Sequence, residues 1–426
     1  SRVRTYAGLA FLIFSSNFYK KNNNKNNIYF IKTKLDKFIR EGYYGGIVDV
    51  IENYTNYQTY KYDVNSHYPN AMLNIMPGGQ PKLSNEKNIE NIFGFVEATV
   101  EAPTEKELKV AILPIKDMDE TKLFRGVKKG IWFSEELKMA LTYGYKIKFI
   151  HSCVQFEKVY GLFDDYVNSM YELKKDAEIN NNLSLRYIYK LLLNSLYGRM
   201  GLKAKLVDLK IVEDEDMEEI FYTEDCDILF KSNNLNLVKS CGSLDLDIVK
   251  LIKDEKLYGL ADNNFKQFNE TNNWEKSTST VYLAAAITAY ARMHLNKYKN
   301  MNNNLYIGGD TDSIILSKPL PDTEISKELG KFKLEYIIEE GLYLSKKFYL
   351  IKTIDGEIII KSKGIENSKG ILNYNSFIKL FRGEDISFKQ IQFFKNYNNM
   401  TIYIKTIYKT IKGLKDEKIN NIFLKK

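Results

Sequence analysis

The spacing of hydrophobic and polar residues changes several times along the 426-residue chain. Residues 162–197 follow helical spacing, and the asparagines at 180–182 divide them into two helices. A helix with a stripe of alanines is predicted over 278–298, and a shorter helix over 134–141. Residues 305–316 carry two apolar runs around a Gly-Gly-Asp-Thr-Asp turn, which predicts a β-hairpin. Together these elements indicate an α+β fold.

Less regular segments separate these elements into blocks. Residues 20–27 (KKNNNKNN) predict a solvated low-complexity loop, and residues 47–63 contain two strand-like runs. Residues 81–160 predict a small α+β insertion. Its strand-like segments are 94–100, 109–115 and 146–156. Residues 203–275 are charged and lack a clear period, which predicts a second, irregular insertion.

The two ends of the chain differ in character. The first residue is Ser1 rather than Met, and 6–14 is already an apolar, structured segment. We therefore expect the chain to be the C-terminal part of a longer protein. The last 75 residues are rich in lysine and are predicted to form helices.

Charge and composition narrow the classes of function. Lysine and arginine exceed aspartate and glutamate by 62 to 54, so the net charge of +8 suits a polyanionic partner. Three scattered cysteines, Cys153, Cys226 and Cys241, form neither a disulfide framework nor a zinc cluster. No apolar run approaches the roughly 18 residues of a membrane span. The abundance of Asn, Lys, Ile and Tyr is typical of an A/T-rich genome.

Carboxylates occur at two strand ends. Asp63 ends a strand-like run just before a turn enforced by Pro69, and Asp310 and Asp312 lie at the tip of the predicted hairpin. Two acids at one tight turn repel each other unless a cation lies between them. Mg²⁺ prefers oxygen ligands from carboxylates and substrate phosphates, so these residues are candidate metal ligands.

The second helix of 162–197 has a cationic face. Residues within about 60° of one another on this face are Arg186, Lys190, Asn194 and Tyr197. The opposite face, predicted to pack on the core, carries Leu185, Ile188, Leu192 and Leu196. Two cations one turn apart suit a triphosphate, and an aromatic residue followed by Gly198 suits a base pair. Carboxylates on separate strands beside such a helix are what two-metal phosphoryl transfer needs.

At these residues the sequence resembles the family B DNA polymerases, and its protein-primed branch in particular. Asp63 to Pro69 (DVNSHYP) is similar to motif A, DxxSLYP, with His67 in place of the usual Leu. Lys190 to Gly198 matches KxxxNSxYG of motif B, and Asp310 to Ser313 matches DTDS of motif C. Motif C normally has Tyr where this chain has Gly308, a position that shapes the hairpin rather than binding metal.

Further matches favour the protein-primed branch. The run from Tyr43 to Gly46 is similar to its YxGG element, and Lys347-Phe348-Tyr349 to its KxY element. The resemblance implies a right-hand architecture with a palm of antiparallel sheet plus helices, helical fingers, a thumb and two insertions. The implied blocks are 1–60 (linker from an upstream exonuclease domain), 61–80 (palm), 81–160 (terminal-protein-region-like insertion), 161–202 (fingers), 203–275 (second insertion), 276–350 (palm) and 351–426 (thumb). We expect the proofreading acids of the family to lie N-terminal to Ser1.

The resemblance also implies roles for individual residues. Two Mg²⁺ ions, with Mn²⁺ as the alternative, are held by Asp63, Asp310, Asp312 and the backbone carbonyl of Val64. The incoming dNTP contacts Val64, Tyr68, Lys174, Arg186, Lys190, Asn194, Tyr197 and Gly198, with Tyr68 excluding a 2′-hydroxyl. Primer-template DNA contacts Tyr43, Gly45, Gly46, Ser66, Thr311, Lys347, Tyr349, Lys361 and Lys363.

These implications define the expected function and its alternatives. The expected activity is DNA-directed DNA synthesis on a primer or a terminal protein, in a mitochondrion or mitochondrial plasmid, or encoded by a virus. One alternative is an RNA-making polymerase, against which Tyr68 argues. The other is a non-catalytic relative that binds DNA or a terminal protein, against which the three intact acids argue.

Overall fold

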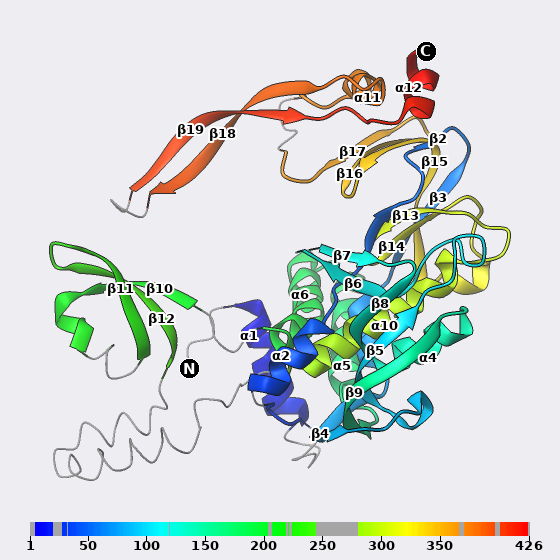
Figure 1. The fold of residues 1–426 in the computed structure, drawn as a ribbon. Helices are drawn as coiled ribbons and strands as arrows, with labels where there is room; N and C mark the ends of the chain where they lie inside the picture. Colours follow the sequence, from blue (N-terminus) through cyan, green and yellow to red (C-terminus); the bar gives the residue numbers. More distant parts are fainter. Residues whose placement is uncertain are drawn as a thin grey trace, which may run out of the picture.

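The computed structural model describes residues 5–19, 28–31, 33–118, 120–202, 207–218, 220, 224–243, 280–365, 370–396 and 401–424. Figure 1 shows a broad lower body, a sheet above it, and a long two-stranded ribbon that extends from the top. No helix in these ranges is long and apolar enough to cross a membrane. The predicted loop at 20–27 lies outside the described residues.

An eight-stranded antiparallel sheet forms the centre of the molecule. Its strand order is β1-β13-β14-β3-β15-β16-β17, and β2 pairs with β15. The strands are β1 (Val48–Val50), β2 (Tyr54–Thr55), β3 (Thr59–Val64), β13 (Tyr306–Asp310), β14 (Ser313–Leu316), β15 (Phe332–Ser345), β16 (Phe348–Thr353) and β17 (Ile358–Ser362). The hairpin predicted at 305–316 is confirmed as β13–β14.

The prediction that residues 1–60 form a linker is wrong, because much of this segment belongs to the folded body. Strands β1 and β2 pair with β13 and β15, so they are part of the central sheet. Helix α1 (Tyr6–Ile13) packs on α6, and α2 (Thr33–Glu41) packs on α10. Buried apolar residues on both helices, such as Ala10 and Ile39, explain this packing. The boundary at 350 also divides β16, which continues the sheet.

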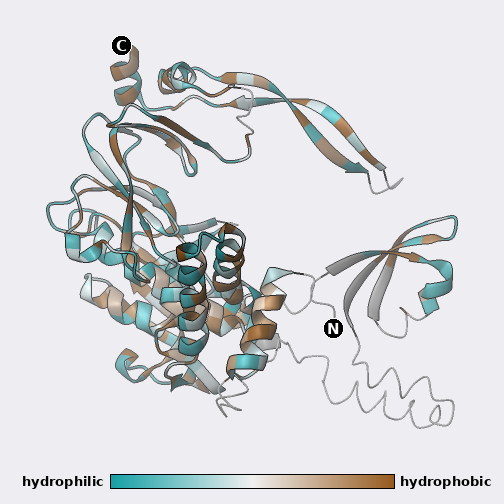
Figure 2. Cartoon of the chain, turned by 180° about the vertical axis from the view of Figure 1, so that it is seen from behind, coloured by the Kyte–Doolittle hydropathy of each residue, from teal (hydrophilic) through white to brown (hydrophobic). Residues whose placement is uncertain are grey.

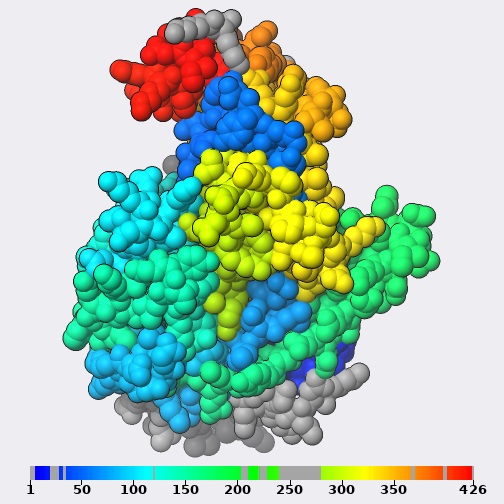
Figure 3. All heavy atoms as spheres, turned by 90° about the vertical axis from the view of Figure 1, so that its right-hand side faces the viewer, coloured from blue at the N-terminus to red at the C-terminus, as the bar shows by residue number. Residues whose placement is uncertain are grey.

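The helices cluster below the sheet. Helix α10 (Val281–Lys299) is buried along most of its length because its alanine stripe permits close approach on several sides. The two helices predicted over 162–197 are α5 (Asp164–Ile179) and α6 (Leu183–Met200), and in Figure 3 this green pair projects to one side. The remaining helical segments here are η1 (Phe14–Tyr19) and α3 (His67–Met72).

The apolar face predicted for α6 is only half right. Leu192 and Leu196 are buried, as expected, but Leu185 and Ile188 are exposed. These two residues lie in the first two turns of the helix, before the part that is buried. Periodicity identifies an apolar face but does not tell how far a neighbouring element extends along it.

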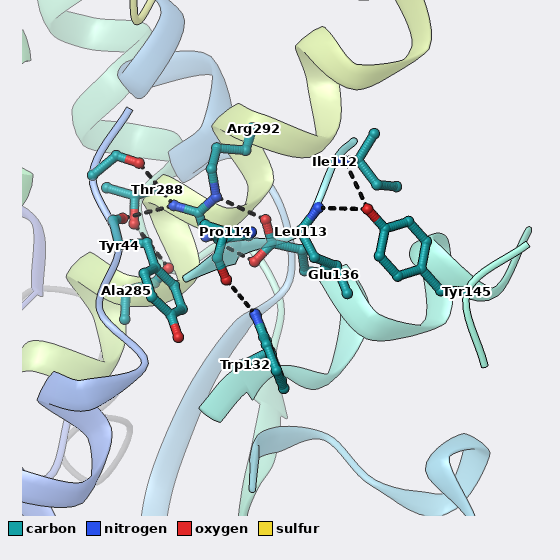
Figure 4. Close-up of polar contacts among 11 residues, drawn as sticks. Tyr44, Ile112, Leu113, Pro114, Trp132, Glu136, Tyr145, Ala285, Thr288 and Arg292 are labelled. Carbon is teal, nitrogen blue, oxygen red and sulfur yellow. Dashed lines mark hydrogen bonds and ion pairs between the residues drawn. The ribbon is translucent and has the colours of Figure 1, made fainter. Parts of the chain in front are cut away.

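The first insertion forms a separate four-stranded sheet with strand order β4-β9-β5-β8. Its elements are β4 (Met76–Ser84), η2 (Ile89–Asn91), β5 (Gly94–Glu101), β6 (Pro114–Asp117), β7 (Glu120–Leu123), β8 (Val127–Phe133), α4 (Ser134–Thr142) and β9 (Lys146–Val159). The predicted strand at 109–115 is wrong for most of its length, because its apolar side chains pack into this block's core from an irregular segment. Figure 4 shows how Tyr145 and Trp132 bond the backbone of that segment.

The second insertion is more regular than predicted wherever the structure describes it. Three strands form an antiparallel sheet in the order β10-β12-β11. They are β10 (Val207–Glu213), β11 (Glu224–Ser232) and β12 (Leu235–Ser243), with η3 (Asp214–Asp216) after the first.

The prediction of helices over the last 75 residues is wrong for most of that segment. After β17, the chain forms α11 (Tyr374–Phe381), the paired strands β18 (Ile386–Asn396) and β19 (Thr401–Ile411), and α12 (Glu417–Leu424). Figure 2 shows hydrophobic and hydrophilic residues alternating along this ribbon. Apolar residues spaced two apart, such as Ile386 and Phe388 or Ile402 and Ile404, together with many β-branched and aromatic residues, favour strands over helices despite the many lysines. A last short turn, η6 (Asp322–Glu324), follows β14.

Candidate active site

Three predicted carboxylates line one cavity, at the end of β3 and in the β13–β14 turn. Asp63 lies directly opposite Ser313 in the β3–β14 pairing, and Asp310 ends β13. The backbone N–H of Val64 donates to the carbonyl of Asp312 over 2.8 Å, which joins the first motif to the third. All three acids line one open cavity of about 440 Å³ on the central sheet.

The turn between the two hairpin acids is held from both sides. Thr311 adopts a positive φ of 61°, and the N–H of Asp312 donates back to the carbonyl of Asp310 over 2.6 Å. The N–H of Thr311 donates to the carbonyl of Ile47 over 2.9 Å, so the residue directly before β1 supports the turn. A threonine adopts the left-handed backbone conformation only where its surroundings enforce it. The contacts on both sides of this turn therefore hold it in a strained conformation.

Crowding of acids raises their proton affinity. Burial, followed by the nearby charge of Asp312, raises the pKa of Asp63 to about 7. The pKa of Asp312 is also raised, mainly by burial. A site whose carboxylates hold protons this tightly binds a hard cation readily, because the cation replaces the proton and relieves the repulsion.

The oxygen donors present fit a magnesium site. Among the described residues, no three His, Cys or acidic side chains converge into a preassembled metal cage. Mg²⁺ usually binds through one or two carboxylates plus substrate phosphates, which matches the pair Asp63 and Asp312. Asp310 is held apart by Lys347, whose ammonium lies 3.0 Å from its carboxylate.

A fourth acid at this site was not predicted from the sequence. Glu335 lines the same cavity and contributes to raising the pKa of both Asp63 and Asp312. It lies at a register shift in the β15–β3 pairing, and it forms an ion pair with Lys61. A bulge turns a side chain towards a different face of the sheet, so strand periodicity alone hides this residue.

The raised pKa of Asp63 predicts how stability depends on pH when divalent metal is absent. From about pH 4 to 7 the folded protein holds a proton that the unfolded chain, with an ordinary aspartate, has released. The contribution of Asp63 to stability should therefore fall as the pH rises from about 4 and be lost once the pH passes 7. Thermal unfolding in EDTA across pH 5 to 8 should show this decline, and Asp63→Asn should flatten it relative to Asp355→Asn. An unchanged slope in Asp63→Asn would contradict the pKa assignment.

The basic residues predicted to hold DNA surround the same cavity. Lys347, Tyr349, Lys361 and Lys363 all line it. Tyr349 on β16 pairs with Lys361 on β17, and the N–H of Lys363 donates to the carbonyl of Lys347. The structure therefore brings together the KxY element and the lysines that follow it.

Cations of α5 and α6 face the first motif. The ammonium of Lys174 lies 3.5 Å from the hydroxyl of Ser66, and burial, then Arg186 and Lys190, lower the pKa of Lys174. Lys190 is close enough to Asp63 to lower that residue's pKa. Arg186 also pairs with Glu178 over 3.2 Å. Lys174 thus lies near the other two predicted triphosphate ligands, and Lys190 also lies near Asp63, while Asn194 is exposed on the same helix.

Two tyrosines from different motifs stack beside this cluster. The rings of Tyr68 and Tyr197 lie 4.1 Å apart and nearly parallel, at 26°. Burial raises the pKa of both phenols, so both are neutral. Gly198 follows with nothing within 4 Å of where a side chain would begin, so the backbone stays open there. Tyr43 packs against the end of α6, close to Gly201.

The two glycines of the YxGG-like element have different surroundings. The carbonyl of Gly45 accepts from Arg292 over 3.0 Å. A side chain on Gly46 would begin 2.6 Å from the methyl carbon of Thr311. The turn that carries the acids therefore rests directly on bare backbone at Gly46.

Gly46→Ala should displace the turn at Thr311 and slow nucleotide incorporation by about 10-fold, because overpacking typically costs ~1–3 kcal/mol. Thr311→Ser removes the methyl group that the new side chain meets. The double variant should therefore recover much of the lost rate, measured by rapid-quench single-nucleotide incorporation. Full activity in Gly46→Ala alone would show that this contact does not set the turn.

The departure at Gly308 has a steric explanation. A side chain there would begin 2.8 Å from the backbone oxygen of Asp49 on β1. The aromatic residue of this strand is instead Tyr306, whose hydroxyl donates to the carboxylate of Asp49. Lys299 lies 3.3 Å from the same carboxylate, and this buried network anchors the hairpin to α10.

Comparisons with known proteins agree with this architecture. The family model of type B DNA polymerases, organellar and viral, matches residues 1–304. A probable DNA polymerase of Agaricus bitorquis is 32% identical over 98% of this chain and 52% of its own length. The DNA polymerase of Streptococcus phage Cp-1 is 26% identical over 71% of this chain and 48% of its own length. The chain thus spans about half the length of these relatives.

The fold also matches a solved polymerase. The structure of Phi29 DNA polymerase with primer-template DNA and incoming nucleotide substrates aligns with a TM-score of 0.70 at 16% identity. That alignment covers 96% of this chain and 68% of the other. The right-hand polymerase fold expected from the sequence is therefore confirmed. By the family match and these relatives, the chain belongs to the organellar and viral type B DNA polymerases.

Proposed function

We propose that this chain adds deoxynucleotides to a primer 3′-hydroxyl under the direction of a DNA template. The observation that carries the proposal is that Asp63 at the end of β3 and Asp312 in the β13–β14 turn line one cavity, beside a cluster of lysines and a stacked tyrosine pair. The polymerases to which the chain is similar, including one solved with primer-template DNA and nucleotides, support the same activity.

Asp63 and Asp312, with Asp310 and the Val64 carbonyl, would hold two Mg²⁺ ions, or Mn²⁺ in their place. When bound, such ions activate the attacking hydroxyl and stabilise charge on the transferring and leaving phosphates. Lys174, Arg186 and Lys190 would neutralise the triphosphate, because Lys174 interacts with both other cations and Lys190 lies near Asp63. Asn194 and Gly198 would border the new base pair.

Tyr68 would select deoxyribonucleotides, because its ring is fixed against Tyr197 and leaves no freedom to avoid a 2′-hydroxyl. The lysines at the cavity, with Tyr349, would hold the primer strand through its phosphates. Tyr43, Gly45, Gly46, Ser66 and Thr311 would complete the DNA contacts.

In the proposed anatomy, the central sheet with α10 is the palm, α5–α6 the fingers, and the segment from α11 to α12, with its ribbon, the thumb. We also propose priming by a terminal protein, contacted by the first insertion, and origin in a mitochondrion or mitochondrial plasmid, with a viral genome as the alternative. The KxY-like and YxGG-like elements, the fungal relatives and the A/T-rich codon usage implied by the composition support these assignments.

Template dependence tests the proposal. Four primer-template duplexes that differ only in the first unpaired template base should each receive the complementary dNTP, at least about 100-fold faster than the other three. Incorporation that ignores the template base would contradict a template-directed enzyme. Tight duplex binding without incorporation by this chain, or by a version extended upstream, would favour a non-catalytic DNA-binding relative.

A further inference from the structure

A buried ion pair joins the first insertion to the helix behind the site. The guanidinium of Arg292 on α10 donates to both carboxylate oxygens of Glu136 on α4, each over 2.7 Å. The side chains are 3% and 0% exposed. Figure 4 shows the remaining guanidinium nitrogen directed at the chain around Tyr44, where it donates to the carbonyls of Tyr44 and Gly45 over 2.6 and 3.0 Å.

The segment held by Arg292 leads directly to the turn that carries the acids. Gly46 lies against the side chain of Thr311, and the carbonyl of Ile47 accepts from the N–H of Thr311. One residue later, Val48 of β1 pairs with Asp310 of β13. Four consecutive residues thus connect the guanidinium to the hairpin tip without an intervening flexible segment.

We propose that Glu136 and Arg292 are positioning residues for the carboxylate turn, and that the first insertion thereby completes the metal site from behind. The inference rests on the proposed function, because it assigns the pair a task in nucleotide transfer. Arg292 holds two carbonyls at fixed places, and Glu136 fixes the plane of the guanidinium by its two parallel bonds. The segment at Gly46 and Ile47 is then held at a fixed distance from the turn at Thr311, which it supports.

The chemistry of the pair favours positioning over simple stabilisation. Removing two charges from water costs so much that buried ion pairs are often matched or exceeded in stability by apolar residues of similar volume. A planar, bidentate pair does, however, define direction and distance in a way that apolar contacts do not. The arrangement here uses that property, since the other two acceptors of the guanidinium are backbone carbonyls in the segment that leads to the catalytic turn.

The same reasoning identifies a sharp test. In the double variant Glu136→Leu with Arg292→Met, both charges are removed together, so no buried charge is left without a partner. Folding should survive, whereas the grip on the two carbonyls is lost. A matched control is Arg125→Met in the same insertion, since Arg125 likewise donates to four backbone carbonyls, but these belong to residues 103–109 rather than to the segment before β1.

Two readouts separate positioning from folding. Mn²⁺ binding is titrated by electron paramagnetic resonance in the presence of primer-template, and the same titration on Asp312→Asn is subtracted to isolate ions at the site. Single-turnover dNTP incorporation gives the maximal rate and the apparent dNTP affinity separately. Melting temperatures show whether each variant is folded.

We expect the double variant to melt within a few degrees of the wild type, bind site Mn²⁺ at least about 5-fold more weakly, and incorporate dNTP about 100-fold more slowly, as a displacement near 1 Å can cause. Arg125→Met should leave Mn²⁺ binding unchanged.

If the double variant fails to fold, Arg292→Lys takes its place. This variant keeps the positive charge but loses the planar guanidinium fork that makes paired hydrogen bonds, so it must show the weaker Mn²⁺ binding. Wild-type Mn²⁺ affinity in a folded variant that lacks the fork would overturn the proposal. Absence of incorporation by wild-type protein would instead count against the proposed function, because the Mn²⁺ titration does not require turnover.

Discussion

Asp312→Asn should lower the rate of nucleotide incorporation by roughly 10³-fold or more while leaving primer-template affinity nearly unchanged. Asp312 directly precedes Ser313, the residue that pairs with Asp63, and burial raises the pKa of both acids. Metal ions held by such a pair supply several kcal/mol of charge stabilisation in the transition state but little to ground-state DNA binding. Rapid-quench incorporation and fluorescence anisotropy on the same duplex measure the two quantities.

Two matched variants serve as controls for this prediction. Asp310→Asn should cost less than Asp312→Asn, because Lys347 already engages Asp310 and the pair Asp63–Asp312 holds the metals. Asp355→Asn, on the exposed turn after β16, should behave as wild type. Equal activity of Asp312→Asn and Asp355→Asn would contradict the assignment of Asp312 as a metal ligand.

Replacing Tyr68 with valine should raise the use of ribonucleotides relative to deoxyribonucleotides by about 100-fold, since loss of a steric clash of this size is worth a few kcal/mol. The ring of Tyr68 is stacked on Tyr197 at 4.1 Å, so it is a fixed wall rather than a mobile side chain. Competing dNTP and rNTP incorporation on one template gives the ratio.

The conservative variant Tyr68→Phe is the control for this prediction. It keeps the ring and the stacking partner and loses only the hydroxyl, so it should retain discrimination against rNTPs. Wild-type discrimination in Tyr68→Val, or lost discrimination in Tyr68→Phe, would show that the ring is not the gate.

Sequence reasoning succeeded where function depends on short, local patterns. The hairpin with Asp310 and Asp312, the helix carrying Lys190 and Tyr197, and their order after Asp63 are each recognisable within about a dozen residues. Their convergence followed from the chemistry, because two-metal phosphoryl transfer requires these groups together. Lys347 and Tyr349 of the KxY-like element line the same cavity as these acids, and their contact with the primer strand stays a prediction.

What the sequence concealed depends on long-range contacts and on irregular backbone. Glu335 reaches the acids through a register shift, which no period reveals. Glu136 and Arg292 are 156 residues apart, and nothing in either local pattern indicates that they form a buried pair. The prediction of helix for the ribbon β18–β19 is wrong because it relies on the many lysines rather than on the apolar residues spaced two apart.

The measurement that tests the central claim most directly is extension of a labelled primer on a DNA template as Mg²⁺ is titrated into metal-free protein, with dNTPs and in parallel with rNTPs. The account predicts growth that requires Mg²⁺, occurs with dNTPs alone, follows the template and disappears in Asp312→Asn. Extension that persists in EDTA, or that survives Asp312→Asn at the wild-type rate, would contradict a two-metal site at Asp63 and Asp312.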